Sequence, residues 1–310
     1  MTECDAPGSE CAVTIPPRPA FLTDDSAAIL RFAAEAMASG SAVALVTLVE
    51  ILGGAARRLG AQMAVRADGA YCGFVSGGCV EAATAAKALE TIASGEDRQI
   101  RFGQGSPYFD IVLPCGGGIT LNIHILRSEQ PLRMVLAALD SRNPAGLRYF
   151  SGSNRLECVP QALACGWNGQ CFDVGYRPRT RLMLFGRTFE AEATARLAQA
   201  AGYDVQIGNS TELRAASRLI DADSAVALLF HDLDTELPAL QVALAAAPFY
   251  IGALGSHRSH QRRVAALAAL GYGEHDIARI KAPIGIFSKA RDAHSLALSV
   301  LADVAAARAG

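Results

Sequence analysis

The sequence lacks the features of a membrane protein, a nucleic-acid-binding protein or a zinc module. No apolar run reaches the roughly 18 residues that a membrane-spanning helix needs. The net charge of −2 and the pI near 6.3 indicate no basic surface for nucleic acid or anionic lipid. The eight cysteines include no Cys-x-x-Cys spacing, and the acidic N-terminus does not resemble a signal peptide. We therefore expect a cytoplasmic protein with reduced thiols, no nucleic-acid or membrane partner, and a small ligand.

The chain is long enough for two domains, and its composition changes along its length. The first residues carry three closely spaced prolines, which block regular structure. A turn-rich stretch with Gly-Trp-Asn-Gly at 166–169 separates two more regular regions. These changes predict a flexible tail, an N-terminal domain, a connecting segment with some β-structure, and a C-terminal domain, at residues 1–20, 21–130, 131–180 and 181–310.

The N-terminal region is organised around residues 73–81, which read Gly-Phe-Val-Ser-Gly-Gly-Cys-Val-Glu. Residues 62–66 and 71–75 flank an Asp-Gly turn and predict a hairpin that leads into this stretch. The turn that follows contains Ser76, Gly77 and Gly78, and Cys79 opens a helix predicted over residues 80–94. Unpaired amides at a helix start suit an anion, and a thiol placed there should ionise more easily than a free thiol.

A second cysteine has similar surroundings. The apolar run 109–113 is followed by Pro-Cys-Gly-Gly-Gly, with Cys115, Gly116 and Gly117, and then by an apolar run at 119–126. Two cysteines beside glycines after two strands predict a shared ligand site. The alternative is that the glycines serve only as turn residues and that the cysteines are small buried apolar groups.

The loop 53–60 places adjacent arginines, Arg57 and Arg58, between glycines. Two guanidinium groups can clamp a phosphate or a carboxylate with a fork of donors. The alternative is a pair of solvated surface charges.

Beyond residue 181, short apolar runs alternate with helical segments, which predicts a Rossmann-like, doubly wound parallel sheet. The predicted strands are 182–185, 204–207, 225–230 and 249–254, and the predicted helices are 190–200, 211–219, 236–246, 259–270 and 293–309. The whole chain is thus predicted to be an α/β protein with a small N-terminal α+β domain. Extended Ala-rich helices are compatible with a homodimer.

The turn after the first of these strands does not carry the dinucleotide fingerprint G-x-G-x-x-G. It reads Gly-Arg-Thr-Phe-Glu-Ala from Gly186, so only the first glycine is present, and Glu190 stands near the expected pyrophosphate contact. No acidic residue ends the second strand to bind a ribose. The sequence therefore argues against NAD(P) as the ligand.

Two other strand ends in this domain carry polar residues. His231 follows the third strand, and Gly255, Ser256 and Arg258 follow the fourth, ahead of a helix with two more arginines. Ligands bind at the carboxyl ends of such strands, and a Gly-Ser turn at a helix start is compatible with an anion. The alternatives are that His231 only pairs with a backbone group and that the two further arginines, Arg262 and Arg263, form a solvated helix face.

Six blocks of the sequence, in order, resemble the XdhC/CoxI family. The blocks at 53–61, 73–81 and 113–118 look like its N-terminal domain, and those at 250–258, 282–286 and 295–308 look like its C-terminal Rossmann domain. These proteins are accessory factors of molybdenum hydroxylases such as xanthine dehydrogenase. The resemblance implies binding of molybdenum cofactor as cargo, a role in its sulfuration with a cysteine desulfurase, and its insertion into an apo-hydroxylase.

This resemblance agrees with the chemistry of the motifs. Molybdopterin carries a phosphate and a dithiolene, so glycine turns and arginines would hold the anion while a thiolate approaches the metal. Cys79 is expected to contact the molybdenum, and Cys115 is either a second contact or structural. A non-enzymatic chaperone is the favoured function, with an NAD(P)-dependent oxidoreductase as the alternative and a scaffold module as a third reading.

Overall fold

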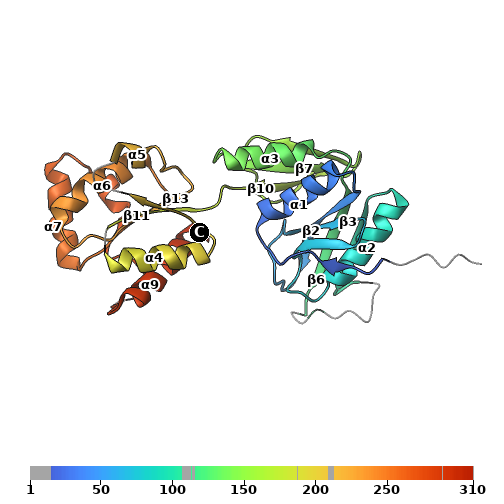
Figure 1. The fold of residues 1–310 in the computed structure, drawn as a ribbon, viewed down its shortest axis with the longest axis horizontal. Coiled ribbons are helices and arrows are strands. Elements are labelled where there is room, and N and C mark those ends of the chain that lie inside the picture. The colour runs from blue at the N-terminus through green and yellow to red at the C-terminus, as the bar shows by residue number, and fades with distance from the viewer. Residues whose placement is uncertain are drawn as a thin grey trace, which may run out of the picture. The chain divides into compact units, whose positions relative to one another are not determined.

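The computed structural model describes residues 15–106, 113, 116–186, 188–208, 213–287 and 289–309. The chain folds into two compact units, Met1–Arg177 and Pro178–Gly310 (Figure 1). Each unit is a separate α/β body with its own apolar core. None of the described helices is long and apolar enough to span a membrane.

The first unit contains two sheets and three helices among its described residues. The six-stranded sheet has the order β1-β4-β3-β2-β6-β5, and the four-stranded sheet has the order β8-β7-β10-β9. The elements in chain order are β1 (Arg18–Pro19), α1 (Ser26–Ala38), β2 (Val43–Leu52), β3 (Gln62–Arg66), β4 (Ala70–Gly73), α2 (Glu81–Ser94), β5 (Arg98–Gly103), β6 (Gly118–Ile125), α3 (Gln130–Asp140), β7 (Ala145–Phe150), β8 (Arg155–Val159), β9 (Gly166–Asn168) and β10 (Cys171–Tyr176).

Strand β2 is the centre of the six-stranded sheet and pairs in antiparallel fashion with β3 and β6. Its continuous apolar sequence is buried on both faces, as expected for a strand covered on two sides. Helix α2 packs on one face together with Val46 and Leu48, whereas α1, α3 and the four-stranded sheet pack on the face of Leu45 and Val49. The predicted hairpin is present as β3 and β4.

Residues 131–177 fold into the first unit. The sequence predicted a connecting segment over residues 131–180, with a little β-structure. In the structure α3 packs against α1, and β7 and β10 carry Leu147, Phe172 and Val174 into the same core as α1. The β-structure is therefore a complete four-stranded layer, and the link to the second unit is confined to the residues around Arg177.

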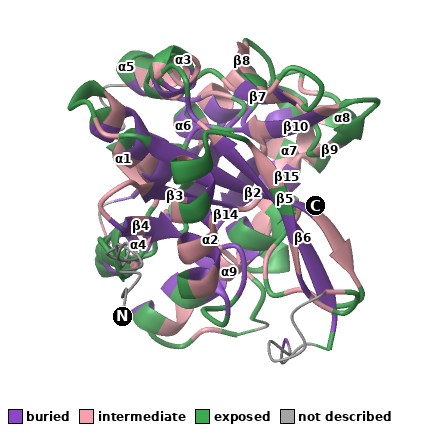
Figure 2. Ribbon diagram, turned by 90° about the vertical axis from the view of Figure 1, so that its right-hand side faces the viewer, coloured by how far each residue is buried: buried purple, intermediate pink, exposed green. Residues whose placement is uncertain are grey.

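The second unit is a parallel sheet with the order β12-β11-β13-β14-β15, which confirms the predicted Rossmann-like, doubly wound fold. Helices α4 and α9 pack on one face, and α5 and α6 pack on the other with a contribution from α7. Strands β13 and β14 are buried along their whole length, and Figure 2 shows strands such as β3 and β14 in the buried colour and much of the helices as exposed. The elements are β11 (Arg181–Phe185), α4 (Phe189–Ala200), β12 (Asp204–Gly208), α5 (Leu213–Ser217), β13 (Ser224–Leu228), α6 (Leu233–Ala246), β14 (Tyr250–Ala253), α7 (His257–Ala269), α8 (Glu274–Ala278), β15 (Ile280–Lys281) and α9 (Ala293–Ala309).

Candidate functional site

Three glycine-containing loops meet where inner strands of the six-stranded sheet end. They follow β2, follow β4 and precede β6, and each was singled out in the sequence. A Cβ atom on Gly117 would lie 2.3 Å from the carbonyl oxygen of Gly54, and one on Gly77 would lie 3.4 Å from the Cβ of Ala56. The loop 53–60 therefore contacts both of the others. We refer to this place, formed by residues 53–60, 74–80 and 116–118, as the loop edge.

The carboxylate of Glu81 holds the loop 74–80 from inside. It accepts backbone N–H groups of Val75, Ser76 and Val80 at 3.1, 2.7 and 3.2 Å, and the Ser76 hydroxyl lies 2.8 Å from its Oε2. Glu81 is buried, with 2% of its surface exposed. The sequence predicted that amides of this turn would bind an external anion, but a carboxylate of the protein takes three of them. Glu81 stands directly after the Gly-Gly-Cys-Val turn in the sequence, but it was not predicted to hold this loop.

Cys79 is held by the same loop with its side chain exposed. Its backbone N–H donates to the Ser76 hydroxyl at 3.2 Å, and the neighbouring Gly77 and Gly78 are also exposed. The helix α2 begins at Glu81 rather than at the predicted residue 80. Cys79 therefore precedes the helix by two residues and is presented on a tight turn, where Gly78 has a φ of +103° that favours glycine.

The two arginines of the loop 53–60 differ in their surroundings. Arg57 is partly buried, and its Nη1 lies 3.2 Å from Oδ2 of Asp24, just before α1. Its Nε is buried and has no hydrogen-bond partner among the described residues. Arg58 is exposed to solvent. Arg57 therefore anchors the loop, and Arg58 is the more accessible guanidinium at the loop edge.

Of the second cysteine turn, Cys115 itself lies outside the described residues. Gly116 is exposed, and Gly117 is buried against the loop 53–60. No group of three or more His, Cys, Asp or Glu side chains in the described part of the chain could hold a metal ion by itself. Cys79 is an accessible soft donor at the loop edge.

The predicted site residues of the second unit lie at the carboxyl edge of its parallel sheet. His231, Gly255 and Ser256 line a cavity of about 600 Å³, together with Lys289 and Arg291. Ser256 caps α7, because its hydroxyl accepts the N–H of Ser259 at 3.2 Å. Arg258 is exposed on the first turn of α7 and is not among the residues that line the cavity. The structure thus brings together three of the four residues predicted here.

The start of α4 is occupied by a carboxylate where a dinucleotide would place its pyrophosphate. Gly186 has a φ of +143°, and a Cβ there would lie 2.6 Å from the carbonyl oxygen of Leu229, so the first glycine of the turn is required. The pKa of Glu190 is lowered by a hydrogen bond from its own backbone N–H and by the Thr188 hydroxyl. Since the carboxylate is anionic and takes helix-start donors, it disfavours a pyrophosphate at the same place.

A smaller cavity of about 140 Å³ shares His231 and Gly255 with the larger one, and its wall contains a buried ion pair. Arg263 contacts Glu236 through two hydrogen bonds, at 2.5 and 3.0 Å, and also donates to the carbonyl of Leu254 at 2.9 Å. Both charged side chains are 2% exposed. From the sequence, Arg263 was either a solvated residue or part of a ligand site. In the structure its guanidinium is buried and joins α7 to α6.

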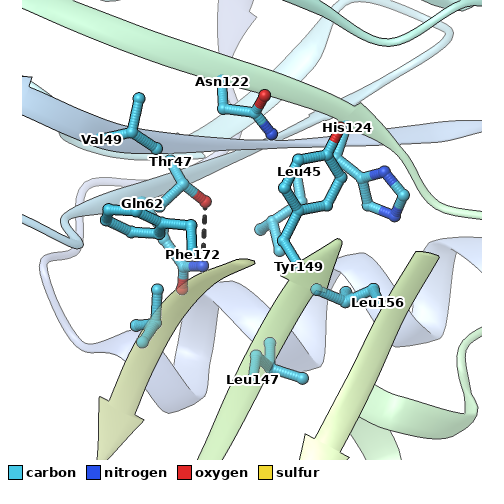
Figure 3. A pocket seen from close by; sticks show the side chains of 11 residues that line it. Leu45, Thr47, Val49, Gln62, Asn122, His124, Leu147, Tyr149, Leu156 and Phe172 are labelled. Carbon is cyan, nitrogen blue, oxygen red and sulfur yellow. Dashed lines mark hydrogen bonds between the residues drawn. The ribbon is translucent and has the colours of Figure 1, made fainter. Parts of the chain in front are cut away.

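Polar side chains also meet between the two sheets of the first unit, around a void of only about 10 Å³ (Figure 3). Gln62 donates to Thr47 at 3.2 Å and accepts from the hydroxyl of Tyr176 at 2.6 Å. Burial, together with the charge of Asp97, raises the pKa of Tyr149 to about 12. Gln62 thus bonds to Thr47 and Tyr176, and Tyr149 bonds to Asp97 and Asn154. The void is about the size of one water molecule, so we assign these groups a structural role.

These features define a two-domain class of protein. Its first domain presents an exposed cysteine and an arginine on three converging loops. Its second domain is Rossmann-like but lacks the fingerprint and the free helix start that a dinucleotide needs.

Comparison with known proteins identifies the family. Residues 36–103 match the XdhC and CoxI family, and residues 182–304 match the XdhC Rossmann domain. The chain is 60% identical over 292 residues to the molybdenum cofactor insertion chaperone PaoD of Escherichia coli K12, covering 94% of this chain and 92% of PaoD. The chain therefore belongs to the XdhC and CoxI family, as the sequence motifs indicated.

Two more distant relatives complete the comparison. The uncharacterized protein YqeB of Escherichia coli K12 is 26% identical over 254 residues, which is 81% of this chain but 41% of YqeB. A crystal structure described as a xanthine dehydrogenase of Bacillus halodurans superposes with a TM-score of 0.71. It covers 90% of this chain and 95% of that one at 18% identity, which supports the fold.

Proposed function

We propose that this protein is a molybdenum cofactor insertion chaperone, which binds molybdenum cofactor as cargo. The observation that supports it most directly is the loop edge, where loops in contact with one another carry an accessible thiol, an accessible guanidinium and exposed glycines. The 60% identity to a protein named as such a chaperone adds to this, because it extends over almost the whole length of both chains.

The loop edge matches the two reactive ends of the cargo. The phosphate of molybdopterin would be held by Arg58, with Arg57 setting the position of the loop. The molybdenum already carries the dithiolene of the pterin, so one further soft ligand from Cys79 would complete the contact. Gly77, Gly78, Gly116 and Gly117 would let the cargo approach the backbone, and Cys115 would be a second contact.

We further propose that the chaperone supports sulfuration of the cargo and delivers it to an apo molybdenum hydroxylase of the xanthine dehydrogenase type. A cysteine desulfurase would supply the sulfur, and the cofactor would pass to the hydroxylase without turnover by the chaperone itself. The cavity lined by His231, Gly255 and Ser256 would bind the same cargo rather than NAD(P), and Arg258 is not part of its lining. A homodimer would be compatible with these roles.

The first experiment is co-purification. The protein is expressed in cells that make molybdopterin and in cells that do not, and each preparation is assayed for molybdenum and for the fluorescent oxidised pterin. The Cys79→Ala variant is prepared in parallel, with Cys171→Ala as the matched control, because Cys171 lies in β10 outside the loop edge. We expect cargo on the wild type and the control, and much less on Cys79→Ala.

The outcomes separate the parts of the proposal. Equal loading of Cys79→Ala and wild type would keep the carrier function and remove Cys79 from the site. A wild-type protein that carries neither molybdenum nor pterin when both are abundant would contradict the carrier function.

A further inference from the structure

Trp167 is the one tryptophan of the chain, and it is not among the residues that form the loop edge. It lies on β9, one of the two edge strands of the four-stranded sheet, and 43% of its surface is exposed. Its indole N–H donates to the carbonyl of Val49 at 3.2 Å, and its ring meets Phe172 edge-on at a centroid distance of 5.2 Å. The ring is therefore fixed in orientation while much of it faces solvent.

The acceptor of this hydrogen bond is a bulged residue. The pairing of β2 with β6 shifts register between Leu48 and Glu50, so Val49 has no partner residue on β6. A bulge of this kind bends a strand and re-aims its groups, and bulges are common beside functional sites. Here it coincides with the place where Trp167 is anchored to the central strand.

This place is close to the loop edge. Val49 precedes the end of β2 at Leu52 by three residues, which corresponds to about 10 Å of extended strand. Two residues before the tryptophan, the Sγ of Cys165 lies 2.8 Å from where a Cβ on Gly60 would be. The segment 165–167 thus lies beside Gly60, at the end of the loop that carries Arg57 and Arg58, and beside Val49 in β2.

An aromatic ring held in place near a loop that carries an accessible guanidinium is suited to a ligand that joins a flat heteroaromatic ring to an anionic group. Such rings stack on tryptophan, and the phosphate pairs with arginine. We propose that the indole of Trp167 is the platform on which the pterin ring of the cargo stacks. This inference rests on the proposed function, because it names the residue that recognises the ring of that cargo.

The test uses the full chain and a pterin with a phosphorylated side chain as the probe, and binding is followed by the fluorescence anisotropy of the pterin. We expect Trp167→Leu to weaken binding about tenfold, because stacking is lost, and Trp167→Phe to retain most of it. Phe189→Leu, an exposed aromatic residue of the second unit, is the control and should bind as the wild type does. Inorganic phosphate is titrated as a competitor, and its inhibition constant should be unchanged in Trp167→Leu.

Each result decides the inference. Equal affinity of wild type and Trp167→Leu would overturn the platform while leaving the carrier function intact. Equal weakening in Trp167→Leu and Trp167→Phe, with a lowered melting temperature in both, would assign the effect to the lost Val49 anchor and overturn stacking. A wild-type protein that binds no pterin probe, with or without its phosphate, would overturn both this inference and the proposed function.

Discussion

The carboxylate of Glu81 accepts the backbone N–H of Ser76 at 2.7 Å and so ties the first residue of α2 to the loop that precedes it. These hydrogen bonds order the loop that presents Cys79 in the absence of a ligand. A binding loop that is already ordered loses little conformational entropy on binding, which favours affinity. We therefore regard Glu81 as the residue that positions Cys79, without contact to the cargo.

Replacement of Glu81 by Ala should destabilise the first unit by about 3 kcal/mol, because several buried donors lose a charged acceptor. Urea denaturation followed by circular dichroism measures this change. Glu90→Ala on the same helix is the control: Glu90 pairs with Lys87 at the exposed surface, and its loss should cost less than about 0.5 kcal/mol. Similar values for the two variants would contradict the assigned role of Glu81.

The contact between Gly117 and the loop 53–60 gives a second prediction. A Cβ at Gly117 would lie 2.3 Å from the carbonyl oxygen of Gly54 and 2.5 Å from that of Leu52, so Gly117→Ala must push the two loops apart. We expect a loss of about 2 kcal/mol in the free energy of unfolding and a loss of cargo on co-purification. Gly152→Ala, whose nearest neighbour is the flexible side chain of Gln170, should change neither, and cargo retained by Gly117→Ala would argue against a site at the loop edge.

Much of the second unit could be predicted from the sequence because its signals are local. Apolar runs such as 182–185 and 225–230 alternate with helices, and this alternation by itself implies a parallel sheet. The missing glycines after Gly186 argue against a dinucleotide turn, and the structure adds the carboxylate of Glu190 at the start of α4, which disfavours a pyrophosphate there.

The loop edge and its surroundings depend on contacts between distant residues, and local patterns do not report these. Val49 and Trp167 are 118 positions apart, yet they share a hydrogen bond, and the turn-rich stretch that contains Trp167 was predicted as a connection. Its strands are short, and β8 and β9 are exposed or half-buried, so they show little of the alternation that marks a strand. The contact of Gly77 with Ala56 likewise follows from strand order.

The buried pair of Arg263 and Glu236 should be needed for the stability of the second unit. Arg263→Met leaves the Glu236 carboxylate buried without a partner, and we expect a loss of about 3 to 5 kcal/mol. The double variant Arg263→Met with Glu236→Leu should recover most of this loss, because no unpaired charge remains. Thermal unfolding of these variants is compared with Arg262→Met, which changes an exposed neighbour. A double variant as unstable as the single one would contradict this explanation.

Asp97 should make the first unit sensitive to acid. Burial alone would raise the pKa of Asp97, but hydrogen bonding and charge from His124, the Ile125 N–H and Arg127 outweigh it and lower the pKa. Because the pKa in the folded state is depressed, the stabilisation is complete above the unfolded value of about 3.9 and is lost as the pH falls through the folded value.

The measurement for Asp97 is the free energy of unfolding of Asp97→Asn and wild type between pH 7 and pH 2. We expect a difference of about 2 kcal/mol at pH 7 that shrinks below pH 4. Asp140→Asn, at an exposed carboxylate, should follow the wild type throughout. A difference that stays constant across this range would show that the charge of Asp97 is not what stabilises the fold.

Arg57 and Arg58 are adjacent but should respond differently to substitution. Arg58 is exposed, so Arg58→Ala should leave stability unchanged and weaken binding of the phosphorylated pterin about tenfold, with a smaller effect at high salt. Arg57→Ala also removes the ion pair with Asp24 and should loosen the loop, which lowers both affinity and melting temperature. Arg133→Ala, on an exposed turn of α3, controls for the loss of one positive charge. Binding by Arg58→Ala that equals the wild type at low salt would move the phosphate away from this loop.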